Sequence, residues 1–384
     1  MTAGAATEIL EKLVAFDTTS CNSNLPIIDY ISNYLADYGV ESERLPNASG
    51  EKANLHATIG PQAVAGVGLS GHTDVVPVIG QDWQTDPFVL TEKNGKLYGR
   101  GACDMKGFLA CVMAAVPEFQ RRSLTVPLHL LFSYDEEIGC TGVRPMIDAF
   151  DERYCRPRMV IVGEPTNMTI VDAHKGPVRW SVSITGRPAH SSMAHLGVNS
   201  IAAAGELLAE LSDIENELKS APLDNRFSPP YTTLQVTEIK GGAASNIVPA
   251  ETWFGWEIRA IPGIDPDTIE GRVRRKARTI EARMRASAPE AKIEIERTNE
   301  VPAFAADPGS EIMSLGLNLA EQNETFAVSY ATEASLFDRA GSPAIICGPG
   351  DIAQAHTPNE WIARSELDKC MVFLRKLADW AASK

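Results

Sequence analysis

The sequence predicts an α/β protein that carries a smaller inserted domain. Short apolar runs alternate with segments of helical spacing up to about residue 175 and again after residue 300, which is the pattern of an α/β sheet. The segment between them has the order β-α-β-β-α-β, that of a ferredoxin-like unit. We therefore expect a mixed-sheet domain formed by residues 1–177 and 300–384, and an inserted domain of residues 178–299.

The elements of the outer domain follow from the spacing of apolar residues. Helical spacing predicts helices over Glu8–Phe16, Leu25–Tyr38, Lys106–Arg121, Glu311–Gln322 and Ser365–Ser383. Short apolar runs are typical of buried strands. They predict strands at Val64–Leu69, Val126–Phe132, Met159–Val162 and Pro343–Cys347.

The inserted domain has a different pattern. Its strands are predicted at Val178–Gly186, Tyr231–Lys240, Ile247–Ile261 and Lys292–Arg297, where apolar and polar residues alternate or apolar residues cluster. Its helices are predicted at Asn199–Lys219, which is rich in Ala, Leu and Glu, and at the charged segment Asp267–Arg285. Two helices on a four-stranded sheet make a small domain with its own core.

Composition excludes several classes of partner. The 384 residues are 44% hydrophobic, with a net charge of −15 and a pI near 5.0, whereas nucleic acids and anionic membranes attract basic faces. We expect neither as a partner. The N-terminus lacks a basic region before an apolar one, so no signal peptide is expected. Seven scattered cysteines without a CxxC pair favour reduced thiols and a cytoplasmic location.

Acids and histidines gather where the predicted strands end. The set comprises His72, Asp74, Glu136, Glu137, Glu164 and His356, with Asp104 in the segment Gly-Arg-Gly-Ala-Cys-Asp-Met-Lys-Gly. Ligands of open α/β sheets bind at the carboxyl ends of the strands. The pattern therefore predicts a metal site at that edge, with two metal ions.

Each of these residues also has an ordinary structural interpretation. A lone histidine at a strand end is usually a hydrogen-bonded structural residue, Asp104 could be a helix N-cap, and Glu136 and Glu137 could be surface acids. Their joint occurrence favours the metal site. In a strand, His72 and Asp74 point to the same side, so that the carboxylate could orient the imidazole. Cys103 and Cys140 are interpreted as buried thiols rather than ligands.

Charge and donor chemistry indicate which metal would bind. Asp104, Glu137 and Glu164 supply three negative charges, and a hydroxide would complete the balance against two Zn²⁺ ions. Nitrogen and oxygen donors without thiolate suit Zn²⁺, with Co²⁺ or Mn²⁺ as alternatives. Two Zn²⁺ ions per subunit are therefore the expected cofactors.

Four segments resemble the dinuclear zinc aminoacylase and carboxypeptidase family: Ser-Gly-His-Thr-Asp-Val-Val-Pro, Gly-Arg-Gly-Ala-Cys-Asp-Met-Lys-Gly, Asp-Glu-Glu-Ile-Gly-Cys-Thr-Gly and Gly-Glu-Pro-Thr. The resemblance implies a metallopeptidase-like catalytic domain in which His72 and Glu164 bind one metal ion and Glu137 and His356 the other. It implies that Asp104 bridges the two and is followed by a cis peptide bond. It also implies that Asp74 orients His72 and that Glu136 is the general base.

The inserted domain resembles the lid and dimerisation domain of the same family. The resemblance implies a homodimer in which His190, in Gly-Arg-Pro-Ala-His-Ser-Ser, reaches the partner subunit's site and stabilises an oxyanion. It implies that Asn246 contacts substrate and that Arg259 holds a substrate carboxylate, a task that suits the guanidinium fork. Without the resemblance, His190 would be a loop histidine and Arg259 a member of a cross-strand salt bridge.

The C-terminal segments Ala-Thr-Glu-Ala and Cys-Gly-Pro-Gly-Asp-Ile-Ala-Gln-Ala-His-Thr-Pro-Asn-Glu most resemble the branch of the family that deacetylates N-acetyl-L-ornithine. We therefore expect a metal-dependent amidohydrolase acting on a small acyl-amino acid. Glu333 is the expected partner of the substrate's side-chain ammonium, or else an acid at a helix start. A desuccinylase, an acetylcitrulline deacetylase or a dipeptidase of the same fold is the alternative. A protein that binds metal without catalysis is the alternative from another class.

Overall fold

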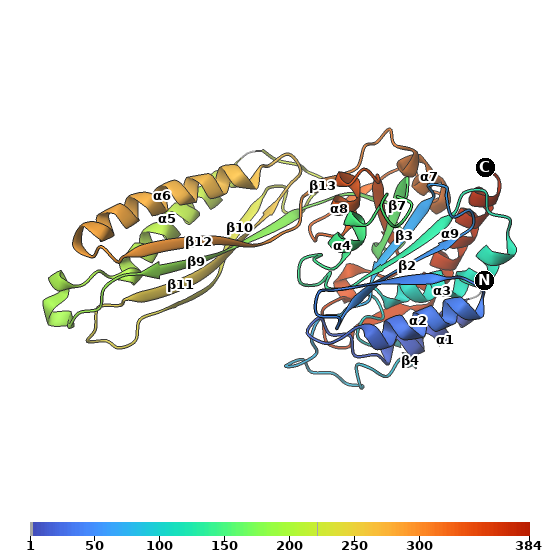
Figure 1. Cartoon of the computed structure of the whole chain (residues 1–384), viewed down its shortest axis with the longest axis horizontal. Coiled ribbons are helices and arrows are strands. Elements are labelled where there is room, and N and C mark those ends of the chain that lie inside the picture. Colours follow the sequence, from blue (N-terminus) through green and yellow to red (C-terminus); the bar gives the residue numbers. More distant parts are fainter. Residues whose placement is uncertain (1–2, 221) are drawn as a thin grey trace. The chain divides into compact units, whose positions relative to one another are not determined.

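The computed structural model describes residues 3–220 and 222–384. It divides into two compact units (Figure 1). The first comprises Met1–Asp172, Ala305–Phe326 and Thr332–Lys384, and the second comprises Ala173–Phe304 and Ala327–Ala331. Met1 and Thr2, at the start of the segment expected not to be a signal peptide, lie outside the described residues, as does Ala221.

A nine-stranded mixed sheet forms the centre of the first unit, in the order β1-β2-β6-β3-β7-β15-β8-β13, with β14 paired to β8. The strands β3, β6, β7 and β15 run parallel to their neighbours within this group, whereas β1, β2 and β8 pair antiparallel. The strands are β1 Ser42–Pro46, β2 Ala53–Ile59, β3 Val67–His72, β6 Leu128–Ser133, β7 Met159–Pro165, β8 Val171–His174, β13 Phe304–Ala305, β14 Phe326–Val328 and β15 Ala344–Gly348.

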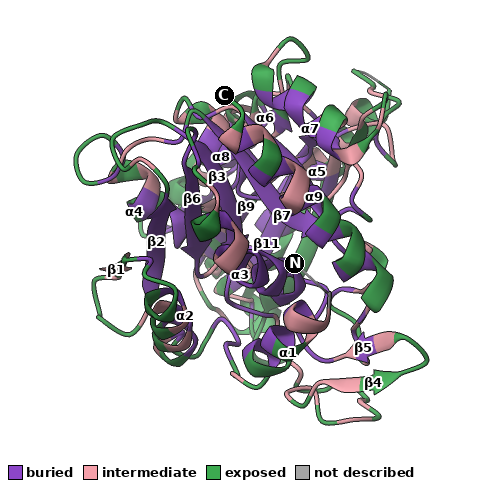
Figure 2. Ribbon diagram, turned by 90° about the vertical axis from the view of Figure 1, so that its right-hand side faces the viewer, coloured by how far each residue is buried: buried purple, intermediate pink, exposed green. Residues whose placement is uncertain are grey.

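Helices bury the central strands of this sheet. Every residue of β2, β3, β6, β7 and β15 is buried, and these strands are purple in Figure 2, where the outer helices show green faces to solvent. A parallel sheet is apolar along its whole length because both faces are covered. The helices are α1 Ala3–Val14, α2 Leu25–Asp37, α3 Lys106–Arg121, α4 Val143–Asp148, α7 Glu311–Ala320, α8 Ala334–Arg339 and α9 Arg364–Ala382.

Helix α3 packs unusually close to the sheet because two strand positions are glycines. A Cβ at Gly163 in β7 would lie 2.1 Å from the ring of Phe108, and one at Gly71 in β3 would lie 2.8 Å from Leu109. Any side chain at these positions would push α3 away. The start of α3, which follows Asp104, is therefore held against the ends of β3 and β7.

A small three-stranded antiparallel sheet completes the first unit. Its order is β16-β5-β4, formed by β4 Thr91–Lys93, β5 Lys96–Tyr98 and β16 Trp361–Ala363, and the short 3₁₀ helix η2, Ile352–Gln354, precedes β16. Pairing of β16 with β5 brings the segment around residue 360 beside residues 96–98. This junction fixes the loop that leads to Asp104.

The second unit is a four-stranded antiparallel sheet in the order β10-β11-β9-β12. It has the predicted chain order, with β9 Gly176–Thr185, η1 Ser191–Leu196, α5 Ser200–Leu218, β10 Thr233–Gly241, β11 Glu251–Ala260, α6 Pro266–Ser287 and β12 Lys292–Glu300. This connectivity and strand order are those of a ferredoxin-like unit. The predicted fold class is confirmed for both the mixed α/β sheet and the inserted unit.

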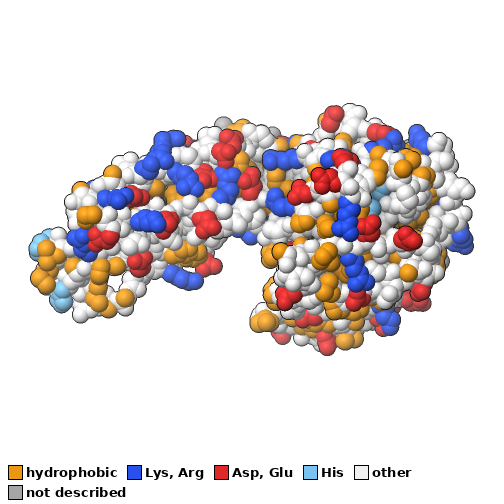
Figure 3. Space-filling model, in the orientation of Figure 1, with side chains coloured by type: hydrophobic (Ala, Val, Ile, Leu, Met, Phe, Trp, Pro, Cys, Tyr) orange, Lys and Arg blue, Asp and Glu red, His pale blue; other side chains and the backbone are white. Residues whose placement is uncertain are grey.

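One face of this sheet and the two helices share a separate apolar core. Trp180 and Trp256, opposite each other on β9 and β11, stack with ring centroids 4.0 Å apart, and apolar residues of α5 and α6 pack around them. Basic side chains outnumber acidic ones on α6, and blue side chains with a few red ones appear along this unit in Figure 3. The predicted charged helix thus presents its charges to solvent.

Several strands begin or end at other residues than the sequence predicted. β3 and β7 continue to His72 and Pro165, past the predicted ends at Leu69 and Val162, because pairing between β3 and β6 continues as far as His72 and Ser133. β11 begins at Glu251 rather than Ile247. Hydropathy marks where a strand is apolar, whereas backbone pairing decides where it ends.

Among the described helices, none is long and apolar enough to cross a bilayer.

Candidate metal centre

The predicted ligands of the first unit converge at one edge of its sheet. His72 is the last residue of β3, Glu164 lies near the end of β7, and the pair Glu136-Glu137 follows β6 by three residues. His356 follows β15, and Asp104 precedes α3. Because β3, β6, β7 and β15 are parallel, their carboxyl ends meet, as expected for a ligand site in an α/β sheet.

Asp104 lies between two histidines, and each of its carboxylate oxygens faces a different one. Oδ1 lies 3.1 Å from Nε2 of His72, and Oδ2 lies 3.2 Å from Nε2 of His356. Asp104 and His72 are buried. The side chain of His356 is 52% exposed, so that this side of the centre opens to solvent.

Each histidine has a second carboxylate beside it. Nε2 of His72 lies 3.7 Å from Oε1 of Glu164, and Nε2 of His356 lies 3.0 Å from Oε2 of Glu137. Two sets of side chains offer donor atoms within 4.8 Å of one another, namely His72, Glu136 and Glu164, and His72, Asp104 and Glu137. Glu136 therefore lies within reach of the same centre.

The electrostatics of this cluster suit divalent cations. Burial, followed by repulsion from Asp104, raises the pKa of Glu164 well above its usual range and that of Glu137 to about 7. Burial likewise raises the pKa of Glu136. Oε1 of Glu164 is buried and has no hydrogen-bond partner within the described chain. Cations among these oxygens would offset both the repulsion and the lost hydration, so the residues fit a metal pair.

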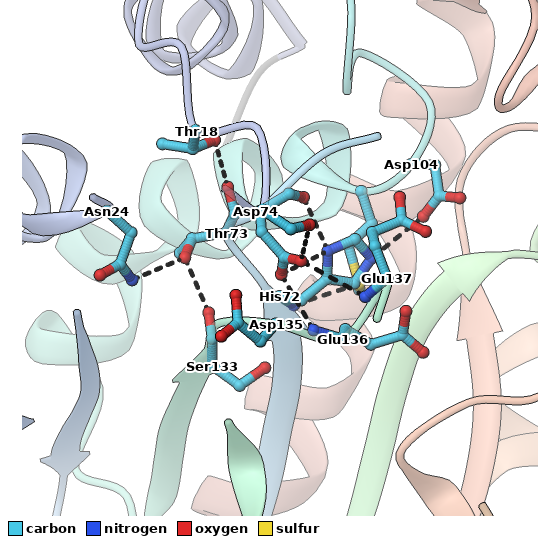
Figure 4. Close-up of polar contacts among 12 residues, drawn as sticks. Thr18, Asn24, His72, Thr73, Asp74, Asp104, Ser133, Asp135, Glu136 and Glu137 are labelled. Atoms are coloured by element: carbon cyan, nitrogen blue, oxygen red, sulfur yellow. Dashed lines mark hydrogen bonds and ion pairs between the residues drawn. The ribbon is translucent and has the colours of Figure 1, made fainter. Parts of the chain in front are cut away.

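The carboxylate of Asp74 connects the segment of Glu136 and Glu137 to that of His72. It accepts hydrogen bonds from Ser20 Oγ at 2.7 Å and from the backbone N–H groups of Glu136 and Glu137 at 3.1 and 3.3 Å. Figure 4 shows Asp74 beside His72, with Asp104 on the other side of the ring. Although burial opposes ionisation, these partners lower the pKa of Asp74.

The contact of Asp74 with the imidazole differs from the expected one. Nδ1 of His72 lies 2.9 Å from the backbone carbonyl oxygen of Asp74 and 3.5 Å from its carboxylate. The chain turns away after His72, the last residue of β3, so the main chain of Asp74 meets the ring first. Because the carbonyl oxygen accepts a hydrogen bond from Nδ1, the proton lies on Nδ1 and Nε2 is left to face Asp104. Nε2 is then the nitrogen that could bind a metal ion.

Thr73 anchors the segment between His72 and Asp74. Its hydroxyl donates to the carbonyl oxygen of Ser133 at 2.7 Å and accepts from Asn24 Nδ2 at 3.0 Å. Thr18 donates to the carbonyl oxygen of Thr73 at 2.6 Å. Figure 4 shows these contacts behind the histidine. The backbone that carries the first histidine is therefore rigid before any metal binds.

Asp104 is not the N-cap of α3, so that alternative is wrong. The capping position is occupied by Met105, and no side-chain capping hydrogen bond is made there among the described residues. The peptide bond between Asp104 and Met105 is cis, as the resemblance implied. The side chain of Asp104 is thereby left free for the two histidines.

Both cysteines near the centre are buried thiols, and all seven cysteines are free. Burial raises the pKa of Cys103 and Cys140, which opposes the thiolate form that a metal ligand requires. The thiol of Cys140 donates to Oε1 of Glu136 at 3.3 Å. The thiol of Cys103 donates to the carbonyl oxygen of Asp351.

Glu333 stands at the start of α8, as its structural interpretation expected, but its side chain makes contacts that the sequence did not indicate. It is 1% exposed, and its two carboxylate oxygens accept hydrogen bonds from Ser70 at 2.9 Å and Ser133 at 2.5 Å. It precedes α8 but makes no side-chain capping hydrogen bond. The carboxylate therefore joins the ends of β3 and β6. Each oxygen of Glu333 thus already accepts one hydrogen bond from a serine.

The predicted residues of the second unit fall into two groups. His190 and Asn246 lie beside each other, because the N–H of Ser191 donates to the carbonyl oxygen of Asn246 at 2.9 Å and His190 pairs with Ile247. His190 is exposed, and its Nδ1 contacts Ser192 Oγ at 2.8 Å. Exposed histidines are visible at the η1 end of this unit (Figures 1 and 3).

Arg259 lies at the opposite end of β11. Its pairing partner on β9 is Pro177, next to the point where the chain enters the second unit at Ala173. At about 3.3 Å per residue, the eight residues from Glu251 to Arg259 span roughly 26 Å. Arg259 and Asn246 of one chain therefore cannot hold the same carboxylate. Arg259 contacts Glu257 on its own strand at 3.3 Å, and Glu257 also pairs with Arg179 across the sheet.

The sequence reasoning missed the residues that support this centre from behind. Glu360 accepts hydrogen bonds from the backbone of Cys103 and Asp104, Arg100 contacts Glu360, and Ser20 contacts Asp74. Only Glu360 had a signal, namely its place four residues after His356 in His-Thr-Pro-Asn-Glu, although the sequence did not show that it is buried. Ser20 and Arg100 lie far from their partners in the chain, and no sequence pattern indicated their roles.

A family model described as Peptidase family M20/M25/M40 matches residues 68–380. The chain belongs to this family. The M20 match begins within β3, the strand that ends at His72, and includes the whole of the second unit. As a member, the chain is a hydrolase that acts on an amide bond.

Relatives in sequence extend the comparison to the whole chain. The chain is 37% identical to an acetylornithine deacetylase of Myxococcus xanthus over 96% of its own length and 95% of that protein. It is 35% identical to an acetylornithine deacetylase of Proteus mirabilis (strain HI4320), over 91% of this chain and 88% of that protein.

Solved M20 structures share the fold. The M20 family metallo-carboxypeptidase Sso-CP2 from Sulfolobus solfataricus aligns with a TM-score of 0.78 at 18% identity, covering 99% of both chains. The Bacillus subtilis YXEP protein, described as a dinuclear metal binding peptidase from the M20 family, aligns with a TM-score of 0.69 at 14% identity, covering 98% of this chain and 97% of that one.

Proposed function

We propose that this M20 hydrolase removes the acetyl group from N-acetyl-L-ornithine, giving L-ornithine and acetate, in arginine biosynthesis. Relatives named acetylornithine deacetylase, which are 31–37% identical over most of the chain, support this substrate. The observation that carries the chemistry is the placement of Asp104, whose two oxygens face two different histidines. A carboxylate in that position can bridge two cations.

The proposed ligand assignment is the one that the family resemblance implies, and the distances of Glu164 from His72 and of Glu137 from His356 support it. His72 and Glu164 would hold one metal ion, His356 and Glu137 the other, with Asp104 between them. These nitrogen and oxygen donors suit Zn²⁺, with Co²⁺ and Mn²⁺ as alternatives. When bound, two such ions polarise the amide carbonyl and lower the pKa of a water molecule between them.

Glu136 is the proposed general base. Its carboxylate lies close to the ligand atoms of His72 and Glu164, but Glu136 itself is not assigned as a metal ligand. It would accept a proton from the attacking water and deliver it to the departing α-amine. Its backbone is fixed by Asp74 and its carboxylate by the thiol of Cys140, so that the side chain is oriented before substrate binds.

A homodimer formed through the second unit is the proposed assembly. β10 is one of the two edge strands of its sheet, and seven of its nine residues are exposed. Large apolar side chains are exposed in the described part of this unit, among them Met193, Leu196, Ile201, Val236, Ile239 and Ile247. An open edge beside exposed apolar side chains favours pairing with a second copy.

The dimer accounts for the two separated groups of predicted residues. We assign Arg259 to the same chain as the metal ligands, where it would hold the substrate's α-carboxylate through its guanidinium fork. His190 and Asn246, which are neighbours, would come from the partner subunit. There His190 of the partner subunit would stabilise the oxyanion. Glu333, already bonded to two serines, is assigned to support the strand ends rather than to bind the ammonium.

The acidic net charge of −15 and seven free cysteines support a cytoplasmic enzyme whose partner is a small acyl-amino acid. The charge opposes binding to nucleic acid or to anionic membrane surfaces.

The deciding experiment measures initial rates of hydrolysis and metal content on one sample. N-acetyl-L-ornithine, N-acetyl-L-citrulline, N-succinyl-diaminopimelate and a dipeptide are compared at equal concentration. We expect the highest kcat/KM for N-acetyl-L-ornithine and two metal ions per chain. A faster reaction with another substrate would identify a sister hydrolase. Bound metal without turnover of any of the four would favour a protein that only binds metal.

A further inference from the structure

The strongest feature outside the assigned roles is a buried charge pair directly behind Asp104. Arg100 and Glu360 are each 1% exposed, and Nη1 of Arg100 lies 2.6 Å from Oε2 of Glu360. A buried charge is retained in a fold only where its partners satisfy it. Here the partners are groups of the metal-binding loops themselves.

Glu360 forms hydrogen bonds with the backbone of the loop that carries Asp104. Its Oε1 accepts hydrogen bonds from the N–H groups of Cys103 at 2.9 Å and Asp104 at 3.0 Å. Its Oε2 accepts from the N–H of Gly101 at 3.1 Å in addition to Arg100. One carboxylate thereby holds three backbone N–H groups within four residues of the loop, and charge-assisted bonds of this kind are short and strong.

The same pair is tied to the loop of His356 by two routes. Glu360 itself follows His356 by four residues. In addition, Gln81 accepts from Nη2 of Arg100 and donates from Nε2 to the carbonyl oxygen of His356 at 3.1 Å. The indole N–H of Trp83 also donates to Gln81 at 3.0 Å, and the Trp83 ring lies 5.1 Å from the Arg100 guanidinium.

We infer that Glu360, Arg100 and Gln81 form a positioning network that sets the distance between Asp104 and His356. His356 is the exposed member of the centre and has a positive φ of 60°, a backbone conformation that the surrounding contacts must maintain. Without the network, the loop of His356 would be free to move relative to Asp104. The separation of these two side chains would then no longer match a metal ion. The inference rests on the metal centre proposed above.

The test compares metal binding in three variants of the full chain. Glu360→Gln removes the charge that holds Asp104. Gln81→Leu removes the connection from Arg100 and Trp83 to His356 but leaves the bonds between Glu360 and the backbone of Asp104 in place. Glu270→Gln is the matched control, since Glu270 is a buried carboxylate of the second unit that accepts hydrogen bonds from Trp180, Arg274 and Arg297. Apo protein is titrated with Zn²⁺ against a competing chelator, and with Co²⁺ by visible absorption. Thermal unfolding of the apo protein is measured in parallel.

We expect Glu360→Gln to weaken both metal ions about 10- to 100-fold, the usual effect of changing a residue that supports a ligand. Gln81→Leu should weaken only the second ion and change the Co²⁺ absorption. Glu270→Gln should lower the unfolding temperature without changing metal affinity. If Glu360→Gln does not fold, Gln81→Leu decides alone, because Gln81 is only half-buried.

Two outcomes would overturn the inference, and they differ from failure of the metal centre. One is that folded Gln81→Leu and Glu360→Gln bind both ions within twofold of the parent with the parent's Co²⁺ spectrum. The other is that Glu270→Gln loses metal affinity as much as they do. If the parent chain binds no metal, the metal centre itself is wrong, and the inference fails with it.

Discussion

The carboxylate of Asp74 accepts the backbone N–H of Glu136 at 3.1 Å. The same side chain approaches Nδ1 of His72 at 3.5 Å. One buried acid therefore positions both the proposed base and the first proposed ligand. Metal binding by His72 and proton transfer by Glu136 would therefore both depend on Asp74.

Replacing Asp74 should therefore damage both metal binding and turnover. Asp74→Ala removes the acceptor for the amides of Glu136 and Glu137, and we expect metal affinity to fall about 10- to 100-fold with a further loss of kcat at saturating metal. Ser20→Ala, which removes only one donor to Asp74, is the matched control and should cost less than tenfold. Equal losses in the two variants would show that Asp74 has no special role.

Replacing Glu136 should abolish turnover while metal binding stays near normal. In Glu136→Gln the side chain keeps its shape but cannot accept a proton, so kcat should fall by about 10²- to 10⁴-fold, the usual contribution of general acid–base catalysis. Metal stoichiometry should remain that of the parent. Glu137→Gln, beside it, should instead lose metal. Full activity of Glu136→Gln would rule out the proposed base.

The contribution of His190 across the dimer can be tested by mixing two inactive chains. Glu136→Ala and His190→Ala chains are unfolded together and refolded, and mixed dimers are isolated by two different tags. Each mixed dimer contains one site with both an intact Glu136 and an intact His190 of the partner subunit. We expect up to about half of the parent's activity per dimer, because one of two sites is restored. An inactive mixed dimer that binds metal would argue against the assignment.

Stability should fall in mild acid because two histidines are buried as neutral groups. His56 and His129 lie on β2 and β6, and burial lowers the pKa of each from 6.5 to about 4. Arg153 also lowers that of His56. The unfolded chain binds these protons first, so stability is complete above pH 6.5 and is lost as pH falls toward 4. A shift of this size corresponds to about 3 kcal/mol for each histidine.

The measurement compares the parent with His56→Phe, which preserves the stacking on Tyr154, where the ring centroids are 4.2 Å apart. Urea unfolding is followed from pH 7.5 to 4.5. The variant should lose stability less steeply below pH 6.5, because it has one fewer group to protonate. Loss of metal in acid affects both proteins and cancels in the difference. Identical slopes would show that His56 does not titrate on unfolding.

Much of the fold and the core of the site could be predicted from the sequence. Apolar runs marked the buried strands because both faces of a parallel sheet are covered. The acids and histidines could then be placed together because such strands end at one edge. His72 and His356, nearly 300 residues apart in the chain, meet for this reason.

The remaining features depended on contacts that no local pattern encodes. Glu360 lies 256 residues from Asp104, and nothing in its neighbourhood shows that its carboxylate is buried. Glu333 stands at the start of α8, as one interpretation expected, but no sequence pattern showed that its two oxygens accept hydrogen bonds from Ser70 and Ser133. Arg259 and Asn246 were both expected to contact substrate, but they lie toward opposite ends of the ten-residue strand β11.

The first unit is assembled from segments that are made at different times. A chain synthesised as far as Glu300 already contains all four strands and both helices of the second unit. It still lacks β15, α9, His356 and Glu360. Because domains generally fold as units, N-terminal first, during synthesis, the inserted unit should fold while the centre is incomplete. A nascent enzyme would then acquire its metal ions only in the last moments of translation, and protease digestion of chains arrested at residue 300 would reveal a protected inserted unit.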